Sequence, residues 1–156
     1  MPDMLVKLYA LPDFRERIRK LEEEGITVRR ALPPEKYLVT GWIKDNFSPA
    51  WASEGEVAFS NQPVSCFIAT RDKELLGFAC YESTCKGFFG PTGVIEDWQG
   101  RGIGTALLLS SLNAMKEMGY AYAIIGGAGP VEYYEKACGA IIIPDSTPGI
   151  YRDLLV

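Results

Sequence analysis

The segment Gln99–Gly104, of sequence QGRGIG, has the residue types and spacing of a phosphate-binding loop. It follows an apolar run, residues 88–95, and precedes a helical pattern that lasts until Met118. Glycines between a strand and a helix N-terminus let successive backbone N–H groups point at one spot, where the helix dipole also favours negative charge. The pattern predicts a phosphate cradle. The alternative is a helix start whose glycines only allow a tight turn and close helix–sheet packing.

Two better-known phosphate loops do not match these residues. A P-loop requires Gly-Lys followed by Ser or Thr, and no lysine follows any of these glycines. The dinucleotide-binding fingerprint requires a small residue three places after its second glycine, where Leu107 stands if the count begins at Gly102. Counting from Gly100 places Thr105 there, which is a weak match.

The order of residues instead resembles the pyrophosphate loop of the GNAT (Gcn5-related N-acetyltransferase) superfamily, Gln/Arg-x-x-Gly-x-Gly/Ala. Val94, five residues before the loop, stands where that family has the strand residue whose backbone meets the acyl group. The segment 134–140, YEKACGA, is similar to the family's Tyr-Glu-Lys-x-x-Gly-hydrophobic segment. Loop, strand residue and tyrosine follow one another in the family's order.

The resemblance implies an N-acetyltransferase that moves an acetyl group from acetyl-CoA directly to an amine, with no covalent enzyme intermediate. It also implies a mixed, mostly antiparallel sheet flanked by helices, with one splayed parallel strand pair that admits the acyl-CoA. The residues assigned to cofactor binding are the strand residue, the loop with its first helical turn, and the tyrosine: Val94, Gln99, Gly100, Arg101, Gly102, Ile103, Gly104, Thr105 and Tyr134.

Three groups are expected to carry the chemistry. The backbone N–H of Val94 would stabilise the oxyanion, and the Tyr134 hydroxyl would protonate the leaving sulfur, because a phenol with a pKa near 10 stays protonated at neutral pH. Tyr133 is the alternative donor. Glu96 is the candidate base that accepts the proton of the amine; Glu82, Asp97 and a water chain are the alternatives.

The chain contains no histidine, which excludes catalysis by Ser-His-Asp or Cys-His arrangements. The four cysteines (Cys66, Cys80, Cys85 and Cys138) form no Cys-x-x-Cys pair. We expect them to be reduced core or strand residues, and we expect no metal site.

The acceptor would be an amine of a small molecule or peptide. Trp51, Glu54, Glu56 and Phe59 lie in a segment without a clear period and could form a mixed aromatic and acidic pocket for a cationic amine. The same aromatic residues could instead only close the core. The alternative function is a non-catalytic acyl-CoA-binding or regulatory module of the same fold.

Composition places the chain among ordinary globular proteins. Its 156 residues suit one domain, and the formal net charge of −4 without a large basic cluster gives no reason to expect a nucleic-acid partner. No apolar run approaches the roughly 20 residues of a membrane span, and no secretory signal is visible, so we expect a cytoplasmic protein without a membrane partner.

The remaining elements follow from periodicity and turn residues. We expect helices near 12–24, 33–46, 103–118 and 131–138, and strands near 26–32, 64–70, 74–83, 86–95, 121–126 and 140–143. Residues 47–63 read as irregular. Residues 1–25 would form a helical extension that covers a sheet edge or mediates a homodimer, and residues 26–156 would form the acetyltransferase domain.

Overall fold

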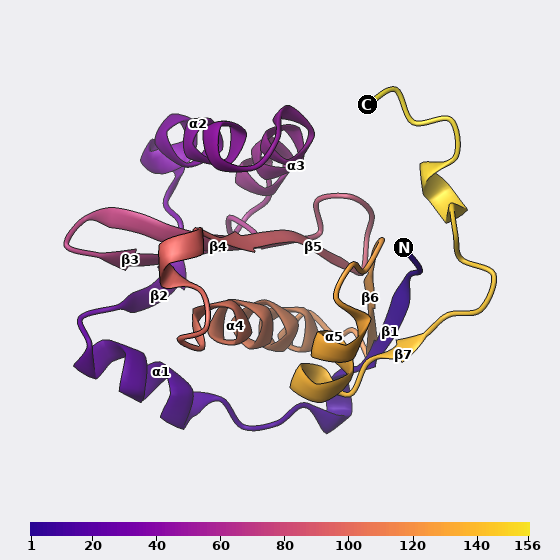
Figure 1. Ribbon diagram of the computed structural model, residues 1–156, viewed down its shortest axis with the longest axis horizontal. Coiled ribbons are helices and arrows are strands. Elements are labelled where there is room, and N and C mark those ends of the chain that lie inside the picture. Colours follow the sequence, from indigo (N-terminus) through magenta and orange to yellow (C-terminus); the bar gives the residue numbers. More distant parts are fainter.

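The computed structural model describes residues 1–156 and contains one seven-stranded sheet with helices on both faces (Figure 1). The strands are β1 (Met4–Lys7), β2 (Thr27–Arg30), β3 (Cys66–Arg71), β4 (Glu74–Tyr81), β5 (Phe88–Val94), β6 (Tyr122–Ile125) and β7 (Ile141–Ile142). Their order is β2-β3-β4-β5-β6-β1-β7, and only the pair β5–β6 is parallel. The expected mixed sheet is therefore confirmed.

The α-helices form the two outer layers. They are α1 (Arg15–Glu23), α2 (Lys36–Asn46), α3 (Pro49–Ser60), α4 (Ile103–Glu117) and α5 (Val131–Cys138). Helices α2 and α3 cover one face of the sheet, and α1, α4 and α5 lie on the other (Figure 1). Short 3-10 turns occupy residues 8–10, 33–35, 96–98 and 149–151.

The two faces of the sheet bury separate apolar clusters. The larger cluster surrounds α4 and includes Leu107 and Leu112 of that helix, Phe89 of β5 and Leu21 of α1. The smaller cluster lies under α2 and α3. Because α4 contributes ten buried residues, it is anchored along its whole length, and its N-terminus is held in a fixed place beside the sheet.

Helix α4 begins and ends where its glycines predict. Gly102 is the N-cap residue with φ 88°, and Gly119 follows the helix with φ 103°. Both conformations favour glycine because a β-carbon is strained there. The hairpin between β3 and β4 turns at Asp72 and Lys73, which have φ of 51° and 65°, so the predicted hairpin is also confirmed.

The prediction that residues 47–63 are irregular is wrong, because most of them form α3. Ser48 caps this helix by accepting a hydrogen bond from the backbone N–H of Trp51 at 3.1 Å, and Pro49 occupies the first helical position. Its small residues give α3 almost no apolar stripe, so the cap was the available sequence signal.

The N-terminal segment differs from the expectation in a second way. Residues 1–25 contain not only α1, which begins at Arg15 rather than near residue 12, but also β1, which the sequence analysis missed. Strand β1 lies between β6 and β7 and pairs antiparallel with both. Met4 and Val6 of this strand are fully buried. Thus part of the N-terminal extension is an inner strand of the sheet.

Candidate functional site

The parallel strands β5 and β6 pair only at their beginning. Phe88 pairs with Ile124 and Phe89 with Ile125, after which β6 ends while β5 continues to Val94 along β4. Pro91 lies in the continuing part of β5 and has no N–H to donate. The predicted splay between the parallel strands is therefore present, and one edge of β5 faces a gap that no strand fills.

The backbone of Val94 faces that gap. The N–H of Ile95 donates to the Leu76 carbonyl of β4 at 2.9 Å. In an antiparallel ladder successive residues point their N–H groups to opposite edges, so the N–H of Val94 points away from β4. The Val94 carbonyl, on the same edge, accepts a hydrogen bond from Nε2 of Gln99 at 3.0 Å. Gln99 thus ties the glycine loop to the strand edge.

The glycine loop presents a row of free N–H groups. The first hydrogen bond of α4 runs from the N–H of Ala106 to the Gly102 carbonyl at 3.1 Å. The six N–H groups from Gly100 to Thr105 precede it, and none has a hydrogen-bond acceptor within the chain. Gly100 and Gly102 have φ of 79° and 88°, which bends the loop around these donors. The loop can therefore bind anionic oxygens through its main chain.

The side chain of Arg101 does not lie over the cradle. Its guanidinium carbon lies 4.5 Å from the ring centroid of Trp98, and that of Arg71 lies 5.4 Å from the same ring. These three residues line a surface pocket together with Glu23, the last residue of α1, and Glu24, which follows it. Arg101 contributes its backbone N–H to the row of donors, and its side chain is held by cation–π contact with Trp98.

Tyr134 lies on α5 and is buried, with 6% of its surface exposed. Burial raises the pKa of its phenol, and the neighbouring Tyr133 and Cys138 raise it further, so the hydroxyl stays protonated. Tyr133 packs edge-on against Tyr134, and its own hydroxyl lies 2.8 Å from Oγ1 of Thr105. Of the two tyrosines, Tyr133 therefore contacts the first turn of α4.

None of the three carboxylates considered as a base is held against the gap. Glu96 and Asp97 are exposed on the 3-10 turn that follows β5, and neither side chain has a hydrogen-bond partner. Glu82 accepts hydrogen bonds from the N–H of Gly87 at 2.6 Å and the hydroxyl of Tyr120 at 3.2 Å. Its carboxylate therefore supports the loop between β4 and β5.

The four residues expected at an acceptor pocket share α3 but not one side of it. Trp51 stacks on Phe47 with 5.4 Å between ring centroids, and Phe59 is buried in the smaller core cluster. Glu54 is half-buried and accepts a hydrogen bond from the Thr84 hydroxyl, whereas Glu56 is exposed. The structure brings Trp51, Glu54 and Phe59 to the sheet side of α3 and leaves Glu56 in solvent.

Sequence reasoning missed a tyrosine on the α3 side of the gap. Phe89 and Ile125 face the α4 core, so the alternating residues Phe88 and Gly126 face α3. Tyr151 lies across Gly126: its hydroxyl occupies the place that a β-carbon of Gly126 would take. Burial raises the pKa of Tyr151 to about 12, and the charges of Asp3 and Glu54 act in the same direction.

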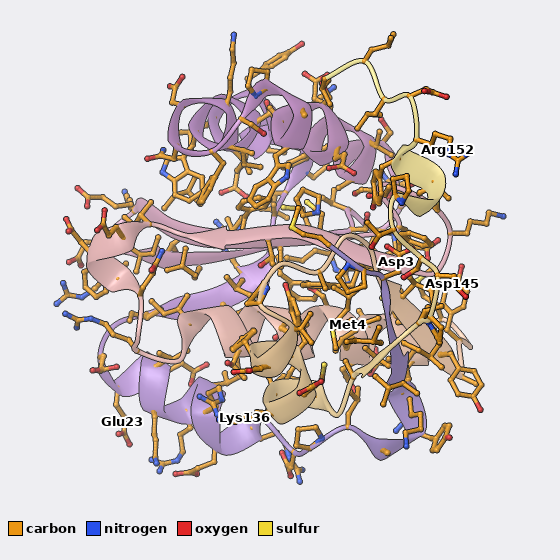
Figure 2. The ribbon with its side chains drawn as sticks, turned by 45° about the vertical axis from the view of Figure 1, so that its right-hand side comes forward. Asp3, Met4, Glu23, Lys136, Asp145 and Arg152 are labelled. Carbon is orange, nitrogen blue, oxygen red and sulfur yellow. The ribbon has the colours of Figure 1, made fainter.

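Asp3 is the second missed residue of this side. It is buried, and its Oδ1 accepts a hydrogen bond from the N–H of Gly127 at 2.8 Å. Its backbone N–H donates to Oγ of Ser146 at 2.9 Å, which joins the two chain ends. Asp3 lies on the same side of the molecule as the C-terminal segment that carries Asp145 and Arg152 (Figure 2). No short sequence motif could have placed residues 3, 54 and 151 together.

The chain thus combines a mixed sheet that has one splayed parallel pair with a loop of free N–H groups at the start of α4. The family model described as Acetyltransferase (GNAT) family matches residues 19–140. The chain therefore belongs to the GNAT acetyltransferase family. No curated protein matches it significantly.

Solved structures support the fold. The glucosamine N-acetyltransferase region of a fungal multi-domain β-N-acetylglucosaminidase has a TM-score of 0.72 at 16% identity, covering 91% of this chain and 19% of its own. An N-acetyltransferase from Sphaerobacter thermophilus has a TM-score of 0.71 at 22% identity, covering 91% and 48%. The chain thus spans less than half the length of either protein.

A third similar structure holds a ligand. A GNAT family acetyltransferase from Brucella melitensis, solved in complex with acetyl-CoA, has a TM-score of 0.53 at 22% identity and covers 71% of this chain and 80% of its own.

No helix of the present protein is both long and apolar enough to cross a membrane.

Proposed function

We propose that this protein is an N-acetyltransferase that transfers the acetyl group of acetyl-CoA directly to an amine. The observation that carries the proposal is that one short segment bears free main-chain donors at both of its ends: the N–H of Val94 in the gap and the six N–H groups of the loop. Such an arrangement suits a ligand whose thioester end lies at a strand edge and whose diphosphate lies at a helix N-terminus.

The loop residues Gln99 to Thr105 would bind the diphosphate through their main chain. Gln99 would have a second role, because its hydrogen bond to Val94 fixes the position of the loop relative to β5. The pantetheine arm would lie along the open edge of β5. The site residues proposed for the cofactor therefore remain Val94, the loop and Tyr134.

In the proposed reaction the nitrogen lone pair of a neutral amine attacks the thioester carbon, and the N–H of Val94 stabilises the negative charge on the oxygen. The C–S bond then breaks, and the Tyr134 hydroxyl gives its proton to the leaving thiolate. Because burial raises the pKa of Tyr134, the phenol is protonated when the thiolate leaves.

A cationic amine loses two protons in each turnover. Glu96, which is exposed two residues after Val94, or a water chain would accept the first proton before the attack. The second proton leaves the nitrogen as the amide forms and returns to the Tyr134 phenolate, which restores the hydroxyl. A Glu96→Gln variant distinguishes the Glu96 carboxylate from the water chain. If the carboxylate is the base, the rate should fall while acetyl-CoA binding stays unchanged; if a water chain accepts the proton, the rate should stay the same.

The acceptor would reach the gap from the α3 side, where Tyr151 lies across Gly126. The negative charges of Asp3 and Glu54, which act on Tyr151, favour a cationic amine there. The proposed acceptor side therefore includes Asp3 and Tyr151, from the two chain ends, in addition to the expected residues Trp51 and Glu54.

The test combines binding and turnover on the same protein. Acetyl-CoA should raise the melting temperature, and a panel of amines should contain at least one that releases free thiol and gains 42 Da by mass spectrometry, about the mass of an acetyl group in place of hydrogen. A raised melting temperature with thiol release at background for every amine would favour the non-catalytic acyl-CoA-binding module. No shift with acetyl-CoA would reject both functions.

A further inference from the structure

We propose that Arg17 of α1 contacts the diphosphate of the bound cofactor and completes the cradle from outside the glycine loop. This inference rests on the proposed function, because it assigns a side chain to the same diphosphate. Arg17 lies on α1 just before residues 19–140, the part of the chain that the family model matches.

The first support is the position of the Arg17 side chain. A β-carbon added to Gly102, the N-cap residue of α4, would lie 2.8 Å from Nη1 of Arg17. A nitrogen of the guanidinium therefore lies beside Gly102, one of the residues that carry the free N–H groups. A guanidinium presents several N–H donors in a plane and can bind two phosphate oxygens at once.

The second support is the charge balance along α1. The other two arginines of this helix are in ion pairs: Arg15 with Asp13, and Arg19 with Glu16 and Glu23. Arg17 has no carboxylate within ion-pair distance. The positive charge of Arg17, which faces the cradle, therefore has no ion-pair partner on the helix. A bound anion would supply the opposite charge.

The third support is that α1 holds Arg17 in a defined direction. Leu21 is 2% exposed in the core cluster around α4, and Phe14 and Ile18 pack against the same cluster. At about 100° per residue, Arg17 projects about 40° from Leu21 around the helix, at the edge of its buried side. Packing of α1 on the core thus directs Arg17 toward the N-terminus of α4.

Two hydroxyl groups stand close to the same place. Oγ1 of Thr105 and the hydroxyl of Tyr133 lie 2.8 Å apart. Burial raises the pKa of Tyr133, and the positive charge of Arg17 acts against that rise, as expected for a guanidinium near the phenol. Arg17, these hydroxyls and the loop N–H groups therefore surround one volume with hydrogen-bond donors.

The test is affinity for three ligands: coenzyme A, dephospho-coenzyme A, which lacks only the 3′-phosphate, and pantetheine, which lacks the diphosphate together with the adenosine 3′-phosphate. Arg17→Gln should weaken binding of the first two by the same factor, about tenfold, and leave pantetheine unchanged, since a hydrogen bond to a charged group is lost. Arg17→Lys should recover part of the loss because it keeps the charge. Arg15→Gln, on the same helix and paired with Asp13, is the matched control and should bind as the unsubstituted protein does.

Unchanged affinity for coenzyme A in Arg17→Gln would overturn the inference and leave the proposed function intact. A loss that disappears with dephospho-coenzyme A would also overturn it, because Arg17 would then contact the 3′-phosphate. A loss equal to that of Arg15→Gln would show an effect of general surface charge and would reject the contact. If the unsubstituted protein binds neither nucleotide, the proposed function fails first.

Discussion

The two sides of the gap between β5 and β6 are built from different kinds of groups. On the side proposed for the cofactor, the donors other than Arg17 are main-chain N–H groups from one short segment, residues 94–105. On the α3 side, the groups are side chains from three distant places: Asp3, Glu54 and Tyr151. A site made of backbone depends on local conformation, whereas a site made of side chains depends on how distant segments pack.

The largest expected effect concerns Tyr134, the one side chain on which the cofactor side depends for chemistry. Tyr134→Phe should lower turnover about 100-fold, the lower end of what general acids contribute, and should leave acetyl-CoA affinity unchanged. Steady-state rates and a thermal shift with acetyl-CoA measure both. Tyr133→Phe is the control, and a larger rate loss in that variant would transfer the role of donor to Tyr133.

The next effect tests whether the cradle is made of backbone. Gly102→Ala places a methyl group at φ 88° and against Arg17, so it should weaken acetyl-CoA binding about tenfold to a hundredfold. Gly119→Ala is the matched control, because φ is 103° and the space is open at the far end of the same helix. Both variants should lose similar stability, about 1–2 kcal/mol. Equal affinities in the two variants would contradict a role of Gly102 in the cradle.

A smaller effect is expected on the α3 side. Glu54→Gln removes a charge but can still accept the hydrogen bond from Thr84, so KM for a cationic amine should rise about threefold to tenfold while the Kd of acetyl-CoA stays the same. Glu56→Gln, two residues further on the exposed side of α3, should change neither quantity. A rise of the same size in both variants would indicate only long-range attraction.

The smallest effect is on stability at high pH. The folded state raises the pKa of Tyr151 to about 12 from an ordinary value of 10, mainly by burial. A raised pKa means that the folded protein keeps a proton that the unfolded chain releases, so the contribution of Tyr151 to stability is present below pH 10 and is lost between pH 10 and 12. Urea unfolding at pH 9, 10, 11 and 12 should show this fall.

Two variants check the source of that fall. Tyr151→Phe should make the fall of stability with pH less steep, because Phe cannot ionise. The buried Tyr134 still contributes to that fall in this variant. Tyr37→Phe, at an exposed position of α2, should leave it as it is. Identical curves for Tyr151→Phe and the unsubstituted protein would show that the phenol is not buried across Gly126 in solution.

The sequence predicted most of the elements because their signals are local. The helices α2, α4 and α5, the hairpin β3–β4 and the splayed strands β5 and β6 lie within a few residues of where periodicity and turn residues indicate. Helix α3 was missed because its small residues give no apolar stripe, although Ser48 and Pro49 marked its start. Strand β1 was missed because four residues are too few to show a period.

For the candidate site, the amino-acid sequence by itself determined the glycine loop, its place at the start of α4 and the position of Val94 five residues before it. Glycine conformations and the unpaired N–H groups of a helix start require only neighbouring residues. Only the tertiary structure decided that Arg17 lies beside Gly102, that Glu96 stays in solvent, and that Asp3 bonds to the N–H of Gly127, 124 residues away. Such contacts form when packing of the whole sheet and its helices orders side chains that no local pattern connects.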